Sequence, residues 1–185
     1  MSLAFLVLAF VAVVNPARVR LGAPEGEGSG RARAGLVALG SLVAFAVGAA
    51  LVAPAGEILA ALDVSPESFR LATGLVLAVE GAWTLVRLPS PVEAALPGRL
   101  GAVVPVAFPL LVTPGLVALA LGAGADASTV EALGALAAAL ALASASAAVE
   151  RGSGSAVVLP AAARLLAAAE IVAAVVIAVE GVRDV

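Results

Sequence analysis

Residues 161–179 read AAARLLAAAEIVAAVVIAV, and only Arg164 and Glu170 in this stretch carry a charge. About 20 predominantly apolar residues are enough for a helix to cross the hydrocarbon core of a bilayer. The stretch therefore predicts a transmembrane helix with one arginine near its start and one carboxyl near its centre.

The rest of the chain has the same character. Of its 185 residues, 63% are hydrophobic and 12% are charged, against roughly 45–50% and about 25% in an ordinary soluble domain. The mean hydropathy is +1.17. A water-soluble globule of this size could not bury so much apolar side chain, so the composition predicts a polytopic membrane protein.

The apolar stretches predict an all-α integral membrane protein with about six transmembrane helices in a single domain, 1–185. The first stretch lacks a charge before Arg18, the reverse of a secretory signal, so we expect a retained span. We expect the sixth span to begin just after Pro160. The expected spans are Leu3 to about Val19, Ala34–Ala53, Phe69–Val86, Val103–Leu121, Val130–Val149 and Ala161–Val179.

Composition also excludes several kinds of chemistry. The chain has no Cys and no His, which excludes disulfides, zinc–thiolate sites and the commonest general base. No metal site or cofactor is expected. We expect no enzymatic activity, because no serine has a plausible base nearby, and no nucleic-acid partner, because no basic patch with interleaved aromatics occurs.

The arginines predict the orientation of the chain in the membrane. The loops after the first, third and fifth spans are expected to hold eight of the ten, which the positive-inside rule places in the cytoplasm. We therefore expect a multi-pass protein of the cell inner (plasma) membrane with both termini outside the cytoplasm. The eight are Arg18, Arg20, Arg31, Arg33, Arg87, Arg99, Arg151 and Arg164.

The two halves of the chain resemble each other. Leu75–Gly81 matches Val175–Gly181 at an offset of 100, and Asn15-Pro16 matches Thr113-Pro114 at an offset of 98. Two repeats of three spans, about 1–88 and about 101–185, would enter the membrane in opposite orientations, as in many secondary transporters.

The register of this repeat is not uniform. Arg70 and Arg164 open the third span of each half, but their offset is 94. The duplication is therefore better supported than any single alignment. We expect both arginines to be interfacial anchors with long side chains that reach toward the headgroups.

The paired prolines mark the candidate substrate-binding residues: Asn15, Pro16, Thr113, Pro114 and Gly115. Proline removes a backbone N–H and breaks a helix, and transporter sites often lie where broken helices of two repeats meet. A pair of simple helix kinks that bind nothing is the alternative.

Glu170 and Glu80 are candidates for proton coupling. A carboxylate at bilayer depth costs at least about 2.5–3.5 kcal/mol, so such a group is protonated, paired or in a wet cavity. The alternative is a structural role, in which each carboxyl hydrogen-bonds to a neighbouring helix or to another subunit.

Four segments resemble the MarC-type integral membrane proteins, the small neutral amino acid transporter type within the LysE-like exporter group. They are the apolar start that leads into Asn15-Pro16, the residues from Gly56 to Gly74, the segment Phe108–Gly115, and Arg164 followed by an apolar run to Glu180-Gly181. The resemblance implies six spans and transport of small solutes such as glycine or alanine, driven by a cation gradient.

The chain also departs from the pattern of that family. Thr113 stands where the family has a glycine, Ala17–Arg20 replaces an expected Gly-Asn segment, and Glu80 and Glu170 stand where apolar residues are usual. These departures indicate a divergent member whose substrate need not be that of the family.

Two functions from different classes remain. The first is a secondary transporter of small neutral solutes such as amino acids, with the lipid bilayer and the solute as its partners. The second is a non-transporting structural or accessory subunit of a larger membrane complex. Homo-oligomerisation is open in both.

Overall fold

The computed structural model describes residues 1–23, 30–89, 98–149 and 155–183 and is helical throughout, without a strand in these ranges. The all-α prediction is confirmed. The elements are α1 Leu3–Val14, α2 Pro16–Gly22, α3 Gly30–Val52, α4 Ala55–Ala61, α5 Pro66–Val86, η1 Gly98–Ala102, η2 Val103–Leu111, α6 Pro114–Asp126, α7 Thr129–Ala148 and α8 Ser155–Arg183.

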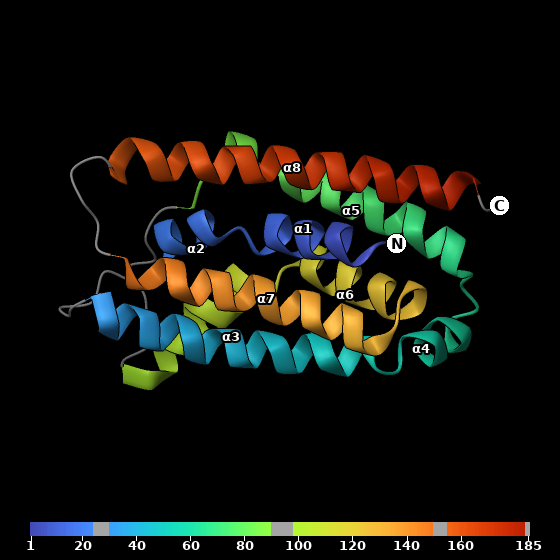
Figure 1. The fold of residues 1–185 in the computed structure, drawn as a ribbon, viewed down its shortest axis with the longest axis horizontal. Coiled ribbons are helices and arrows are strands. Elements are labelled where there is room, and N and C mark those ends of the chain that lie inside the picture. The colour runs from blue at the N-terminus through green and yellow to red at the C-terminus, as the bar shows by residue number, and fades with distance from the viewer. Residues whose placement is uncertain (24–29, 90–97, 150–154, 184–185) are drawn as a thin grey trace.

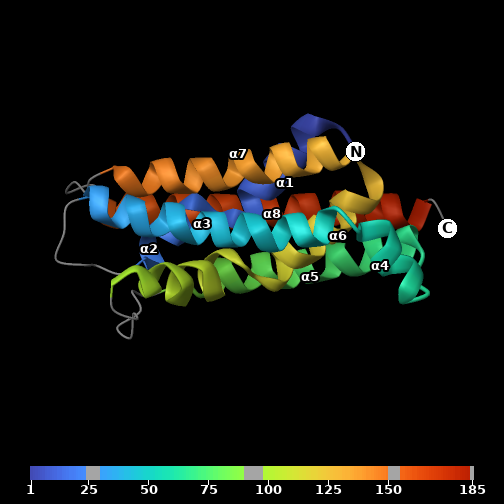
Figure 2. The same ribbon diagram turned by 90° about the horizontal axis from the view of Figure 1, so that it is seen from below.

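The long helices run side by side along one axis, as a membrane bundle requires (Figures 1 and 2). In the described part of the chain, five segments are long and apolar enough to span a membrane. A sixth is reached if the bent pair Gly98–Leu111 and Pro114–Asp126 counts as one span. The polytopic fold is therefore as expected.

Local sequence signals explain where the helices begin. Ser65 caps α5 and is followed by Pro66, and Ser128 forms a reciprocal capping box with Glu131 at the start of α7, an arrangement that satisfies the free N–H groups of a first turn. The sixth span begins earlier than expected: α8 starts at Ser155, so Pro160 lies inside the helix.

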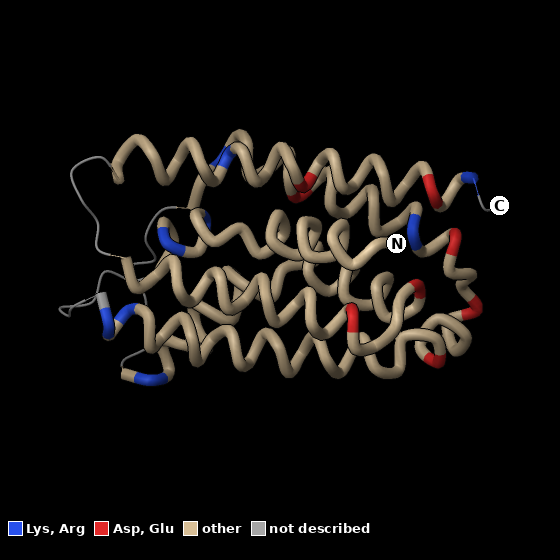
Figure 3. The backbone as a smooth tube through the Cα atoms, in the orientation of Figure 1, with Lys and Arg blue, Asp and Glu red and all other residues tan. Residues whose placement is uncertain are grey.

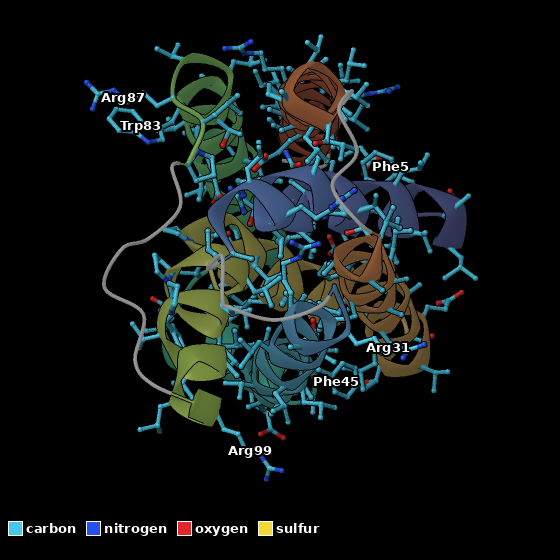
Figure 4. The ribbon with its side chains drawn as sticks, turned by 90° about the vertical axis from the view of Figure 1, so that its left-hand side faces the viewer. Phe5, Arg31, Phe45, Trp83, Arg87 and Arg99 are labelled. Carbon is cyan, nitrogen blue, oxygen red and sulfur yellow. The ribbon has the colours of Figure 1, made fainter. Side chains whose placement is uncertain are left out.

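The helices form two pairs with the broken spans between them. Helices α5 and α8 make one pair and α3 and α7 the other, and these are the most extensive helix contacts in the described residues. Viewed along the bundle, α1 and α2 lie between the pairs (Figure 4). Since α1 packs on both α7 and α8, the first span is the most deeply buried one.

Helices α5 and α8 approach closely because small residues line their contact. A methyl group added at Gly74 would come within 2.7 Å of the Ala174 carbonyl oxygen. Likewise, one at Gly81 would come within 2.9 Å of the Ala167 oxygen, and one at Gly181 within 2.8 Å of the Glu67 oxygen. The contact of Gly81 with Ala167 and the contact of Gly181 with Glu67 are related by a shift of 100 residues in each partner. The packing of α5 on α8 therefore follows the offset of 100 and not the offset of 94.

Charge is divided between the two ends of the bundle (Figure 3). At the end where α2, α5 and α7 finish, the charged residues that the structure describes are arginines: Arg20, Arg31, Arg33, Arg87, Arg99 and, further along α8, Arg164. Arg151 lies outside the described residues. The opposite end carries Arg70 and Arg183 together with the acids Glu57, Asp63, Glu67, Asp126, Glu131 and Glu180.

Candidate functional site

The first span is broken at Asn15. Its backbone is left-handed (φ 47°, ψ 77°), a conformation that asparagine tolerates better than most residues. Its side-chain oxygen accepts a hydrogen bond from the Arg18 N–H at 3.0 Å, and its side-chain nitrogen donates to the Ala163 carbonyl at 2.9 Å. Asn15 therefore ends α1, caps α2 and ties the break to α8.

The bent pair of η2 and α6 is interrupted at Thr113, whose backbone is extended (φ −101°, ψ 164°) and not left-handed. The Thr113 hydroxyl accepts a hydrogen bond from the Leu116 N–H at 3.1 Å, and Pro114 is the first residue of α6. The two halves of this span meet at 71°. Both breaks thus use a polar cap, a proline in the first helical position and a bond to the N–H three residues after the cap.

An ion pair connects the two breaks. Nη1 of Arg18 in α2 lies 2.9 Å from Oε1 of Glu80 in α5. Nη2 of Arg18 donates to the carbonyls of Val13 at 3.0 Å and of Leu110 at 3.4 Å. These carbonyls lie in the last turns of α1 and η2, where unpaired carbonyls favour a cation.

Glu80 also binds the N-terminus of α6, the half-helix that follows the break at Thr113. Its Oε2 accepts a hydrogen bond from the Gly115 N–H at 2.7 Å, at the N-terminus of α6, where the helix dipole favours an anion. A Cβ at position 115 would lie 2.5 Å from Oε2, so a larger residue there would displace this carboxylate. Glycine at 115 therefore allows the close contact.

Glu170 lies beside this ion pair with no exposed surface. Neither of its carboxyl oxygens has a hydrogen-bond partner in the described part of the chain, and the same holds for Nε of Arg18. The charges of Glu80 and Arg18 both act on Glu170. Arg18, Glu80 and Glu170, from α2, α5 and α8, thus influence one another electrostatically, and in the described part of the chain the Glu170 carboxyl is unpaired.

A cavity of about 550 Å³ reaches Arg18 and Glu80. Leu75, Val79 and Trp83 on its rim are 61%, 71% and 59% exposed, so the cavity opens on the flank of α5. Trp83 points away from the bundle beneath the Arg87 guanidinium, 4.7 Å from the ring centroid (Figure 4). The lining residues are Arg18, Leu75, Val76, Val79, Glu80, Trp83, Thr84, Thr113 and Pro114.

The cavity adjoins one break and not the other. Thr113 and Pro114 line it, and Gly115 borders it through Glu80. Asn15 and Pro16 are buried and packed instead: Asn15 bonds to α8, and Ser146 donates to the Pro16 carbonyl at 3.5 Å. The five predicted substrate-binding residues are thus joined through the Arg18–Glu80 pair, but they do not share one open pocket.

Arg18 is the site residue that the sequence analysis missed, since it was assigned to a cytoplasmic loop. That assignment was wrong: the helix resumes at Pro16, so Arg18 lies in the first turn of α2 and is only 8% exposed. A signal was present, because an arginine within an apolar span needs a counter-charge, and Glu80 is such a charge.

Arg70 does more than anchor a helix end. Its Nε and Nη2 lie 2.7 and 2.8 Å from the two carboxylate oxygens of Asp126, the last residue of α6. Since Glu80 holds the first turn of α6, helix α5 binds both ends of that half-helix through charged groups. Arg164 donates to the Leu85 carbonyl at 3.4 Å.

Comparisons with known protein families, with curated proteins and with solved structures find no match to this chain. Among the described residues, no group of three acidic side chains is arranged to hold a metal ion. Function must therefore be inferred from the site, and the site offers charge pairing and hydrogen bonding at two helix breaks.

Proposed function

We propose that the chain is a secondary transporter of small neutral solutes such as amino acids, coupled to protons. One observation carries the proposal: two helix breaks meet at the partly buried pair of Arg18 and Glu80, whose charges act on the buried carboxyl of Glu170. Buried ionisable residues within spans mark substrate or ion pathways by default. Half-helix ends at breaks commonly bind the charged groups of substrates.

Glu170 is the proposed coupling residue, with Glu80 as its partner. When Glu170 is neutral, the three groups together have no net charge, because Arg18 and Glu80 cancel. When it is ionised, two carboxylates compete for one guanidinium. Proton loss therefore weakens the hold of Arg18 on Glu80, and through it the link between the two breaks.

The repeat and the charge distribution support the proposed topology. The contacts across α5 and α8 follow the offset of 100, which fits two inverted units of three spans. The arginine-rich end would lie in the cytoplasm by the positive-inside rule, with both termini on the other side of a plasma membrane. The resemblance to MarC-type proteins adds small neutral amino acids as the first substrates to test.

A second function is favoured by one observation. The cavity opens on the flank of α5, a surface that would face lipid or another subunit. An accessory subunit of a larger membrane complex would offer such an apolar rim, with Leu75, Val79 and Trp83, to a helix of its partner.

Counterflow in proteoliposomes tests the transporter. Vesicles loaded with unlabelled alanine, glycine or serine should take up the labelled solute, and an inward proton gradient should accelerate uptake. Glu170→Gln should abolish the acceleration. Glu180→Gln should retain it, because Glu180 lies on the same helix but near its end.

Two results would overturn the proposal. One is no flux across a broad amino acid panel, together with a stoichiometric partner that copurifies, which would establish the accessory role. The other is an unchanged response to the proton gradient in Glu170→Gln, which would show that the Glu170 carboxyl has a structural role only.

A further inference from the structure

We propose that a zwitterionic substrate binds by inserting into the Arg18–Glu80 ion pair. The substrate carboxylate takes the place of the Glu80 carboxylate on Arg18 and on the Gly115 N–H, and Glu80 then pairs with the substrate ammonium group. This inference rests on the proposed transport function and specifies how its site would recognise a substrate.

In the structure, the Glu80 carboxylate occupies the position that we propose for the substrate carboxylate. The two oxygens of Glu80 each have one donor: Nη1 of Arg18 at 2.9 Å and the Gly115 N–H at 2.7 Å. One donor is a cation and the other lies at the N-terminus of a 13-residue helix, so both favour an anion. Any small carboxylate could use the same two donors once Glu80 moves aside.

The charge balance selects the class of substrate. Insertion of a zwitterion turns one ion pair into two and adds no net charge to the site. With Glu170 neutral, a simple anion would leave Glu80 without a partner, and a simple amine would leave Arg18 without one. An unpaired charge in such a site is costly, so both should bind much more weakly than a zwitterion of the same size.

Two polar groups at the site have hydrogen-bonding atoms without partners among the residues described. Arg18 is 8% exposed, yet its Nε has no hydrogen-bond partner among the residues described. Both oxygens of the fully buried Glu170 are also unpartnered there. An arriving carboxylate could gain this Arg18 donor, because Arg18 lines the cavity.

The cavity gives a small substrate access to both charges. Arg18 and Glu80 line it together with the apolar side chains of Leu75 and Val79. Arg18 stays anchored during the exchange, since its Nη2 bonds to the carbonyls of Val13 and Leu110 and not to Glu80. Only the Glu80 side chain has to move.

The experiment uses three ligands of similar size: alanine, propionate and ethylamine. Trp83 is the only tryptophan of the chain and lines the cavity, so its fluorescence reports binding to the purified protein in detergent. Calorimetry on the same samples provides an independent measure. We expect the intact protein to bind alanine at least about tenfold more tightly than the other two.

The variant Glu80→Gln sharpens the test. It removes the competing charge but keeps the side chain's size, so propionate should gain at least about tenfold in affinity and alanine should lose its advantage. Glu180→Gln, far from the Arg18–Glu80 pair, should leave all three affinities unchanged. Size-exclusion profiles of both variants check that the protein remains folded.

The outcomes separate this inference from the proposed transport function. Equal affinities for the three ligands, or no binding by fluorescence and calorimetry, would overturn insertion into the ion pair, whatever the flux measurements show. Alanine-selective binding without counterflow in proteoliposomes would instead overturn transport and leave the recognition mechanism standing.

Discussion

The two helix breaks have the same local design but different surroundings. Asn15-Pro16 and Thr113-Pro114 each cap a new helix and place proline in its first position. The break at Asn15 is sealed by α8, whereas the break at Thr113 lines a cavity and bends its span by 71°. A proline motif therefore determines where a span is interrupted, while its neighbours determine whether the interruption is accessible.

Loss of Arg18 should have the largest effect on this comparison, because Arg18 serves both breaks. Arg18→Gln leaves the partly buried Glu80 without a cation and removes the donor to Val13 and Leu110. Removal of one partner from a fully buried ion pair costs about 3–5 kcal/mol, which sets the upper limit for this pair. Thermal unfolding in detergent should show a markedly lower midpoint.

A double variant provides the control for Arg18. Arg18→Leu with Glu80→Leu replaces both charges by apolar groups, which is often close to neutral. The double variant should therefore be more stable than Arg18→Gln alone. Equal midpoints for the wild type and Arg18→Gln would show that the ion pair does not hold the breaks together.

Much of this architecture could be predicted from the sequence, for identifiable reasons. Long apolar stretches fix the helices, and Pro16 and Pro114 fix the breaks, because both signals are local. The helix start at Ser155, ahead of Pro160, was missed because a proline near a helix start is compatible with either boundary.

The pairing of the charges could not be predicted in the same way. Arg18 and Glu80 are 62 residues apart in sequence, and their contact depends on how α2 and α5 pack. The sequence indicated that Glu80 and Glu170 need partners or water but not which partners they have. The same applies to Arg70, which was expected to be an anchor and is paired with Asp126.

A smaller effect is expected at the second residue of each half-helix, where the two breaks differ. Gly115→Ala brings a Cβ to within 2.5 Å of the Glu80 carboxylate, and overpacking of this kind costs about 1–3 kcal/mol. Ala17→Gly, at the equivalent position of α2, should cost only about 0.5–1 kcal/mol. The unfolding midpoints of both variants compare the two sites directly. A larger loss for Ala17→Gly would contradict a stabilising contact between Glu80 and the N-terminus of α6.

The caps themselves give the last comparison, and the order of their effects tests which break is the sealed one. Thr113→Ala removes a single capping bond, and loss of a cap costs about 0.5–2 kcal/mol. Asn15→Ala removes the cap to Arg18, removes the bond to Ala163, and places alanine in a left-handed backbone.

We therefore expect Asn15→Ala to lower the unfolding midpoint more than Thr113→Ala. Asn15→Gly separates the contributions, because glycine accepts the left-handed backbone without strain and any remaining loss belongs to the side-chain bonds. If Thr113→Ala were the more damaging change, the cavity-lining break would be the one that holds the bundle together, and the Asn15 break would be the better candidate for movement.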